Sequence, residues 1–203
     1  MAGANPNAWN NWYHCVGSTY GAWLPGDPRG FRTFRHRLHV EGDYKNPPAA
    51  GTFTAIYERS KRLMKRPAVV LGREQREVVC KAMIEQLQRD GVEAVALAIA
   101  SNHFHLLARF PLLSAEEQAR LSKTLLRDGR DPAPRHFLGL ARKQASLALV
   151  KMQLKPLGTQ VWGDRPLCEP VRDRRHQCNV ARYICGHVKE DAAVWDWARG
   201  FLF

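Results

Sequence analysis

Two short segments, far apart in the sequence, carry the side chains best suited to chemistry. His103-Phe104-His105 lies in an apolar run that reads as a β-strand, whereas Tyr183 and His187 lie in a run with helical apolar spacing. A strand points alternate side chains to opposite faces, so the two strand histidines share a face. Helix residues four positions apart are neighbours, so the tyrosine and His187 also share a face. Together they could form a metal-assisted nucleophilic site suited to attack on a phosphodiester.

Each of these motifs alone is a weak signal. The chain has eight histidines, so a pair with one residue between them readily arises by chance. The pair could equally be ordinary strand histidines, and a tyrosine on an amphipathic helix is usually a core residue whose hydroxyl reaches the surface. The combination of paired imidazoles, a tyrosine with a third imidazole one turn later, and a basic chain is what favours a reactive site.

The charge of the chain indicates a polyanionic partner. Lys and Arg number 31 against 19 Asp and Glu, which gives a net charge of +12. So much like charge repels itself in a folded protein, and nucleic acid is the commonest partner that offsets it. The alternative is a basic surface with no specific partner.

The cysteines and the apolar runs bear on the cellular setting. Five cysteines with no CxxC pair favour free thiols in a reducing cytoplasm. A structural zinc site is a second hypothesis, although its spacing matches no standard motif; its ligands would be Cys168, Cys178, Cys185 and His176. We find neither a signal peptide nor an apolar run as long as a membrane span, so a cytoplasmic protein without a membrane partner is expected.

The elements that must position the reactive side chains follow from apolar periodicity. We expect one domain over residues 1–203 with an α+β fold, a central antiparallel sheet with helices on one face, in a split βαβ or ferredoxin-like arrangement. Strands are expected within 12–23 and at 92–99, 103–110, 161–162 and 167–171. Helices are expected over 72–91, from a capping box at 114–117 to about 127, and over 135–155 and 176–189. Trp195, Trp197 and Phe201 are expected in a short tail that packs against the domain.

A basic segment at residues 24–52 is expected to be an irregular insertion, because proline and glycine interrupt it. Long irregular segments within compact domains often carry function. Aromatic residues beside arginines suit base stacking with phosphate contacts; the arginines are Arg29, Arg32, Arg35 and Arg37. A surface insertion without a binding role is the alternative.

Longer stretches around these motifs resemble a known family, the HUH single-tyrosine transposases. Asn-His-Phe-His-Leu-Leu at 102–107 is similar to their HUH motif of histidine, bulky hydrophobe and histidine, and 181–187 is similar to their tyrosine helix. Residues 20–31 and 42–48 resemble the branch called REP-associated tyrosine transposases. The resemblance spans about residues 13 to 197 with the motifs in the same order.

The resemblance implies an HUH fold and a role for each motif residue. His103 and His105 would bind a divalent metal, Mg²⁺ or Mn²⁺, and Tyr183 would be the nucleophile. Family members often carry an amide four residues after the tyrosine to complete the metal site, whereas this chain has His187. Imidazole is a good ligand for transition metals, so this departure favours Mn²⁺ or a similar ion over Mg²⁺.

The resemblance also implies a reaction and a substrate. The protein would cleave single-stranded DNA, beside a hairpin, through a 5′-phosphotyrosine intermediate and would rejoin strands without ATP. A homodimer is common in the family, and a monomer fits this branch as well. Further candidates for phosphate contacts are Arg142, Lys143, Lys151, Arg172, Arg174 and Arg182. The competing hypotheses are a domesticated protein that binds hairpins without cutting them, and a conventional nuclease that uses activated water.

Overall fold

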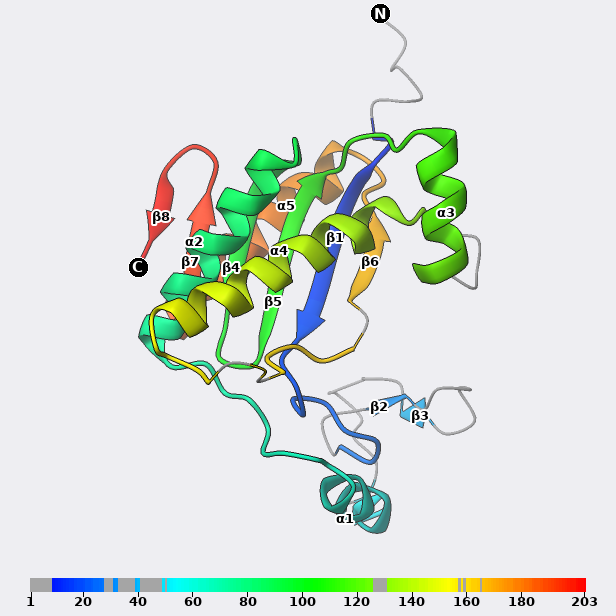
Figure 1. Cartoon of the computed structure of the whole chain (residues 1–203), viewed down its shortest axis with the longest axis vertical. Coiled ribbons are helices and arrows are strands. Elements are labelled where there is room, and N and C mark those ends of the chain that lie inside the picture. The colour runs from blue at the N-terminus through cyan, green and yellow to red at the C-terminus, as the bar shows by residue number, and fades with distance from the viewer. Residues whose placement is uncertain are drawn as a thin grey trace, which may run out of the picture.

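The computed structural model describes residues 9–27, 31–32, 39–40, 49, 51–125, 131–156, 158, 160–164 and 166–203. Most of the basic segment predicted at 24–52 therefore lies outside the described residues. Within it, β2 (Phe31–Arg32) pairs with β3 (His39–Val40) in antiparallel fashion. Helix α1 (Thr54–Arg62) follows and lies beyond one end of the main sheet (Figure 1). Among the described residues, no helix is both long and apolar enough to cross a membrane.

The main sheet has six strands in the order β6-β1-β5-β4-β7-β8, and every neighbouring pair is antiparallel (Figure 1). The strands are β1 (Trp12–Ser18), β4 (Glu93–Ile99), β5 (His103–Arg109), β6 (Leu167–Pro170), β7 (Ala193–Asp196) and β8 (Gly200–Leu202). The predicted α+β class with a central antiparallel sheet is confirmed. The strand predicted at residues 161–162 forms only a single bridge, between Trp162 and Thr19.

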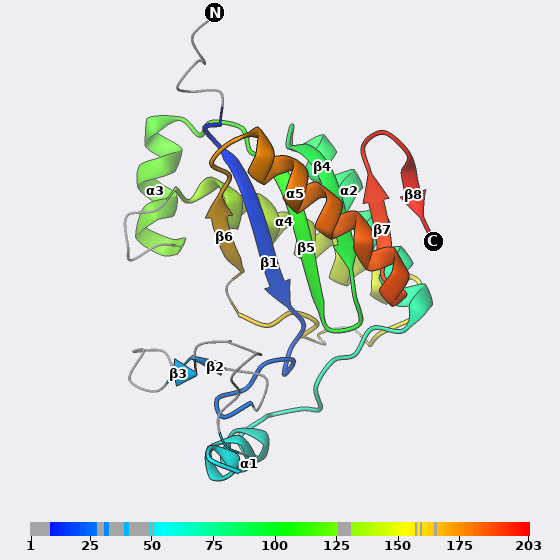
Figure 2. The same ribbon diagram turned by 180° about the vertical axis from the view of Figure 1, so that it is seen from behind.

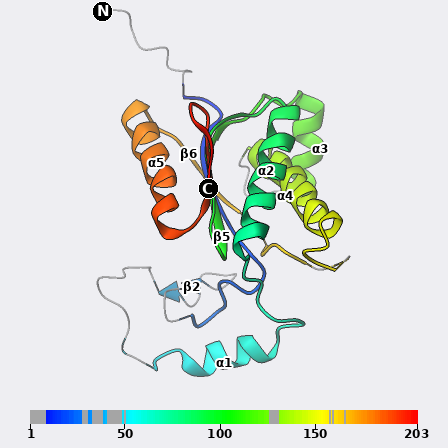
Figure 3. The same cartoon turned by 90° about the vertical axis from the view of Figure 1, so that its left-hand side faces the viewer.

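The helices cover both faces of this sheet, so the prediction that they share one face was wrong. Helices α2 (Arg73–Arg89), α3 (Ala115–Leu125) and α4 (Ala133–Lys151) lie on one side, and α5 (Arg174–Gly186) lies on the other (Figure 3). The physical reason is that the central strands are buried on both faces, and a sheet can bury two faces only between two layers.

Two apolar clusters hold these layers together. The larger one joins α2 and α4 to one face of the sheet, where Phe104 and Leu106 of β5 are fully buried. The smaller one lies under α5 and includes Ala96 and Ala98 of β4 with Ile184 of α5. Because alanine side chains are short, they let α5 lie close to the sheet.

A close contact between neighbouring strands fixes the position of one core ring. Gly17 of β1 lies directly opposite Phe104 of β5. A Cβ atom at Gly17 would overlap the Phe104 ring. The absence of a side chain there gives the ring its place in the core.

The ends of two helices follow local rules. The predicted capping box is confirmed: Glu117 N donates to Ser114 Oγ and Ser114 N donates to Glu117 Oε2, both at 3.2 Å. The last helix begins two residues earlier than predicted, because Asp173 caps it by accepting a hydrogen bond from His176 N at 2.7 Å. It ends at Gly186, and a short 3₁₀ turn, η1 (His187–Glu190), follows.

The segment predicted as a packed tail is instead part of the main sheet. Trp195 lies in β7, opposite Leu97 of β4, and is buried. Trp197 and Phe201 are exposed, at 69% and 39% of their surface, so the prediction that they pack down was wrong. Strands of three or four residues show too few alternations for sequence periodicity to detect them.

Candidate metal and nucleophile site

Strand β5 positions the two histidines of the first motif. Its alternate residues Phe104 and Leu106 belong to the cluster under α2 and α4, whereas Leu107 belongs to the cluster under α5. His103 and His105 have the same parity as Leu107, so they lie on the α5 face. His105 is buried, with 7% of its surface exposed, and His103 is half-buried.

Helix α5 and the turn after it supply the second motif. Val180 and Ile184 are buried against the sheet and fix the rotation of the helix. Figure 2 shows that α5 lies across strands β5 and β4, on one face of the sheet. This placement brings the Tyr183 ring to 4.8 Å from the His187 ring and 5.2 Å from the His105 ring, measured between centroids. The two motifs, distant in sequence, therefore lie side by side.

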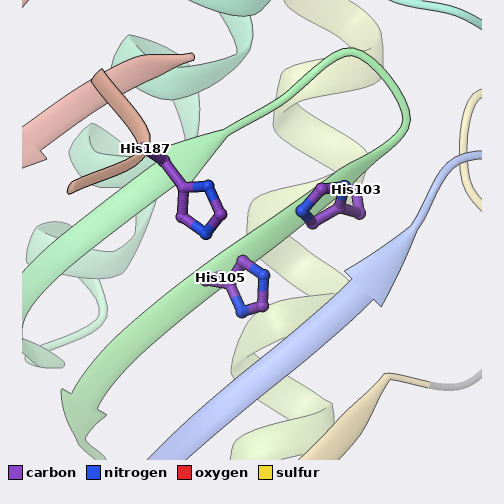
Figure 4. Close-up of side chains that lie close together, drawn as sticks. All are labelled: His103, His105 and His187. Carbon is purple, nitrogen blue, oxygen red and sulfur yellow. The ribbon is translucent and has the colours of Figure 1, made fainter. Parts of the chain in front are cut away.

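The three histidines converge. One ring nitrogen from each of His103, His105 and His187 can be chosen so that all lie within 4.8 Å of one another (Figure 4). Nitrogens bound to a first-row metal at about 2.1 Å lie roughly 3 to 4 Å apart, depending on the coordination angle. Small side-chain rotations would bring these nitrogens to that spacing, so the triad could hold a metal ion.

Two of the histidines have orienting partners beside them. Nδ1 of His103 lies 2.8 Å from Oδ1 of Asn102, and Nδ1 of His187 lies 3.0 Å from Oε2 of Glu190. An amide oxygen and a carboxylate oxygen only accept hydrogen bonds, so these contacts favour a proton on Nδ1 of each histidine. Nε2 is then the ring nitrogen that can offer a lone pair to a metal, and such outer partners commonly orient metal ligands.

The burial of the site also fits a metal. Nε2 of His187 is buried and has no hydrogen-bond partner among the described residues, a costly state that a coordinated ion would relieve. The pKa of His105 is lowered to about 3, first because burial disfavours its charged form and then because it faces His103, His14 and His187. His105 is therefore neutral at physiological pH and keeps a lone pair for a ligand bond.

A fourth imidazole, which the sequence prediction missed, lies beside the triad. Nε2 of His14, on β1, lies 3.1 Å from Nδ1 of His105. The register pairs Val16 with His105 and His14 with Leu107, so His14 is a diagonal neighbour on the same face. Strand alternation over residues 12–18 could have predicted which residues share a face with His14. The contact with His105 could not be predicted in this way, because it depends on the pairing of β1 with β5.

Tyr183 is accessible as well as close to the histidines. Its side chain is 53% exposed, although His105 and His187 beneath it are buried. The phenol thus lies at the surface directly above the imidazoles, where a large substrate could reach it.

The predicted basic residues other than Arg142 fall in three settings. Arg172, Arg174 and Arg182 are exposed at the start of α5 or on it, in the layer that carries the site. Lys143 and Lys151 are exposed on α4, on the opposite side of the sheet. Outside the described residues lie Arg29, Arg35, Arg37 and the side chain of Arg32.

Arg142 has a different environment from the other basic candidates. Its guanidinium donates to the carbonyl oxygens of Asp164, at 3.0 Å, and Gly163, and it lies over the Trp162 ring at 5.4 Å. These contacts tie the segment around 163–164 to α4. Burial lowers the pKa of this guanidinium.

The cysteines show no sign of the alternative zinc site. All five are free, and Cys185 Sγ donates to Asp196 Oδ2 at 3.2 Å. Over the described part of the chain, the histidine triad is the one cluster of potential metal ligands. A cavity of about 500 Å³ also lies away from the chemistry, since its lining includes Trp9, Tyr13 and Arg172 but none of the triad.

Comparison with known proteins adds a distant likeness. No family model matches the chain, and no curated protein matches it. One solved structure that it resembles is a REP-associated tyrosine transposase bound to a REP hairpin. The two share 13% sequence identity with a TM-score of 0.42, over 89% of this chain and 68% of the other.

Proposed function

We propose that this protein cleaves and rejoins single-stranded DNA, with Tyr183 as the nucleophile and His103, His105 and His187 as ligands of a divalent metal. One observation carries the proposal: an exposed phenol lies within 5.2 Å, ring to ring, of the two buried members of the histidine triad, His105 and His187. The HUH-like and tyrosine-helix motifs in the sequence support the same assignment.

The chemistry is an exchange of phosphodiesters. Tyr183 Oη attacks the phosphorus, the bond from phosphorus to the 3′ oxygen breaks, and a 5′-phosphotyrosine and a free 3′-hydroxyl result. The phenol, whose ordinary pKa is about 10, loses its proton during attack, and the departing 3′ oxygen gains one. A second 3′-hydroxyl attacking the phosphotyrosine reverses these bonds and joins strands. Nothing is oxidised or reduced, and no ATP is needed.

The ligand set bears on the identity of the metal. A divalent ion, when bound, supplies Lewis-acid polarisation of a phosphate oxygen. Three imidazole ligands suit Mn²⁺ or another transition metal better than Mg²⁺, which prefers oxygen ligands. The chain's own contribution is to bring these imidazoles together beside Tyr183, with His105 kept neutral by burial.

The substrate is proposed from charge and from the motif resemblance. Arg172, Arg174 and Arg182 are exposed in the same layer as Tyr183, where they could contact the phosphates of a bound strand. The net charge of +12 favours such a polyanion. The resemblance to REP-associated tyrosine transposases points to single-stranded DNA beside a hairpin.

The test is a labelled-strand assay with Tyr183→Phe. Pools of single-stranded hairpin DNA, labelled at the 5′ or 3′ end, are incubated with Mn²⁺ or Mg²⁺ and separated on denaturing gels. The wild type should retain the 3′-end label on the protein, and Tyr183→Phe should not. Tyr57→Phe, in α1 and away from the triad, is the matched control and should form the adduct.

Three other outcomes would change the assignment. Nicking retained by Tyr183→Phe would remove this residue from the mechanism. Free fragments without an adduct would indicate hydrolysis by activated water. Binding of hairpin DNA with neither product would favour a protein that binds hairpins without cutting them.

A further inference from the structure

His14 contacts the centre of the triad without belonging to it. Its Nε2 lies 3.1 Å from Nδ1 of His105, and the two rings are nearly parallel, at 25°. The distance is that of a hydrogen bond between ring nitrogens. Both imidazoles lie on the α5 face of the sheet, where His105 is buried.

A hydrogen bond between two neutral imidazoles has a direction. Each ring has one N–H donor and one lone-pair acceptor, so one must donate and the other accept. If His105 accepted at Nδ1, its proton would lie on Nε2 and would block that nitrogen as a ligand. If His105 donates from Nδ1, its Nε2 lone pair is available to a metal.

We propose that His14 is a positioning residue that accepts a hydrogen bond from Nδ1–H of His105 and so fixes the tautomer in which His105 Nε2 can bind a divalent metal. The inference rests on the proposed function for the identity of the ligand. It assigns no contact between His14 and the metal or the DNA.

The surroundings of His14 support this direction. Glu169 of β6 lies directly opposite His14 in the β1–β6 register, on the same face of the sheet. Glu169 lies on the β6 side of His14, away from His105 on β5, so its negative charge favours a proton on the ring nitrogen that does not face His105.

The other two ligands provide an internal comparison. Glu190 offers carboxylate oxygens that can only accept, and Asn102 presents its amide oxygen, so both favour a proton on Nδ1 of the histidine that they face. His14 differs from them in presenting a ring nitrogen that could either accept or donate. The tautomer of His105 therefore depends on His14 and on the charge beyond it.

The experiment compares two substitutions at residue 14. His14→Leu removes the acceptor, whereas His14→Gln offers an amide oxygen at a reach similar to that of Nε2. Mn²⁺ binding is measured by isothermal titration calorimetry, and the tautomer of His105 in the metal-free protein is read from long-range ¹H–¹⁵N correlation spectra. If the leucine variant does not fold, His14→Asn serves in its place, since its amide is polar but too short to reach His105.

The expected result is about 10- to 100-fold weaker Mn²⁺ binding in His14→Leu, the usual cost of losing an outer partner, with affinity restored in His14→Gln. His105 should carry its proton on Nδ1 in the wild type and in His14→Gln, and should populate both tautomers in His14→Leu. A purely packing role would change the melting temperature of the metal-free protein but not the tautomer.

Two results would overturn the inference: wild-type affinity with an unchanged tautomer in His14→Leu, or a proton on His105 Nε2 in the metal-free wild type. Failure of the proposed function is a separate result, since it would appear as a wild type that forms no Tyr183 adduct. The tautomer measurement decides the role of His14 in either case.

Discussion

Strand β5 sends apolar side chains into one face of the sheet and imidazoles into the other. Under α2 and α4, Phe104 and Leu106 are fully buried in a dense apolar cluster. Under α5, His103 and His105 meet His187 and Tyr183. The two faces share a backbone, so their difference comes entirely from the alternation of side chains.

One face of β5 contributes mainly to the stability of the fold, and the other carries the side chains of the candidate site. Burial of Phe104 and Leu106 removes apolar surface from water and stabilises the fold. The other face buries imidazole nitrogens, including His187 Nε2 without a partner among the described residues, and an unsatisfied buried polar atom costs about 1–3 kcal/mol. The α5 face therefore gives up some packing stability and gains side chains that could bind a ligand.

The largest expected effect comes from removing the imidazoles of β5. His103→Ala with His105→Ala should abolish metal-dependent cleavage, because two of three ligands are lost. The domain should stay folded, because the apolar face is untouched. In calorimetry, Mn²⁺ should raise the melting temperature of the wild type and leave that of the double variant unchanged. A collapse of the metal-free thermal transition would instead assign these histidines to the fold.

Phe104, which lies between the two histidines of β5, should affect the stability of the fold and not metal binding. Phe104→Ala should lower the free energy of unfolding by about 3–5 kcal/mol, as expected for emptying a core position. Denaturant melts measure this loss. At temperatures where the variant is folded, its Mn²⁺ affinity should match that of the wild type. A marked loss of metal binding by the folded variant would mean that the two faces are not independent.

A smaller effect is expected at the outer partner of His187. Glu190→Gln keeps the shape of the side chain but removes the carboxylate charge that faces Nδ1 of His187. Mn²⁺ binding should weaken by about 10-fold to 100-fold, measured by titration calorimetry. Glu93→Gln, at the far end of β4, is a matched control and should leave the affinity unchanged.

The smallest expected effect is on the salt dependence of DNA binding, which compares basic residues on α5 with basic residues on α4. Arg174→Gln and Arg182→Gln on α5 should each reduce the slope of log affinity for single-stranded DNA against log salt by about 0.7, because each removes one phosphate contact. Lys143→Gln and Lys151→Gln on α4, behind the sheet, should leave the slope unchanged. Fluorescence anisotropy over a salt series measures both pairs, and equal slopes for the two pairs would contradict a DNA path along α5.

Local sequence patterns were sufficient for the parts of the molecule that local forces determine. Helix α2, strands β4 and β5 and the Ser114 cap follow from periodicity and capping chemistry. The proximity of Tyr183 and His187 follows from helical spacing. The pairing of the two histidines of β5 on one face follows from strand alternation.

Relations between distant segments could not be predicted in the same way. His14 and His105 are 91 residues apart and meet through strand register, which no local pattern encodes. The side of the sheet on which α5 lies depends on burial of both faces of β4 and β5, and that burial can be read only after the strand order is known.

The sheet order also determines when the site can exist during synthesis. Its parts come from β1, β5, α5 and the turn after α5. Strand β7, which follows that turn, pairs back to β4. A nascent chain that has left the ribosome only as far as the end of α4 can pair β1 with β5. It still lacks Tyr183 and His187, which come later in the sequence. Contacts of such long sequence separation form slowly, because closing long loops costs entropy. The proposed centre would therefore be completed only at the end of folding, and a nascent chain that lacks α5 and the turn after it would not yet hold it.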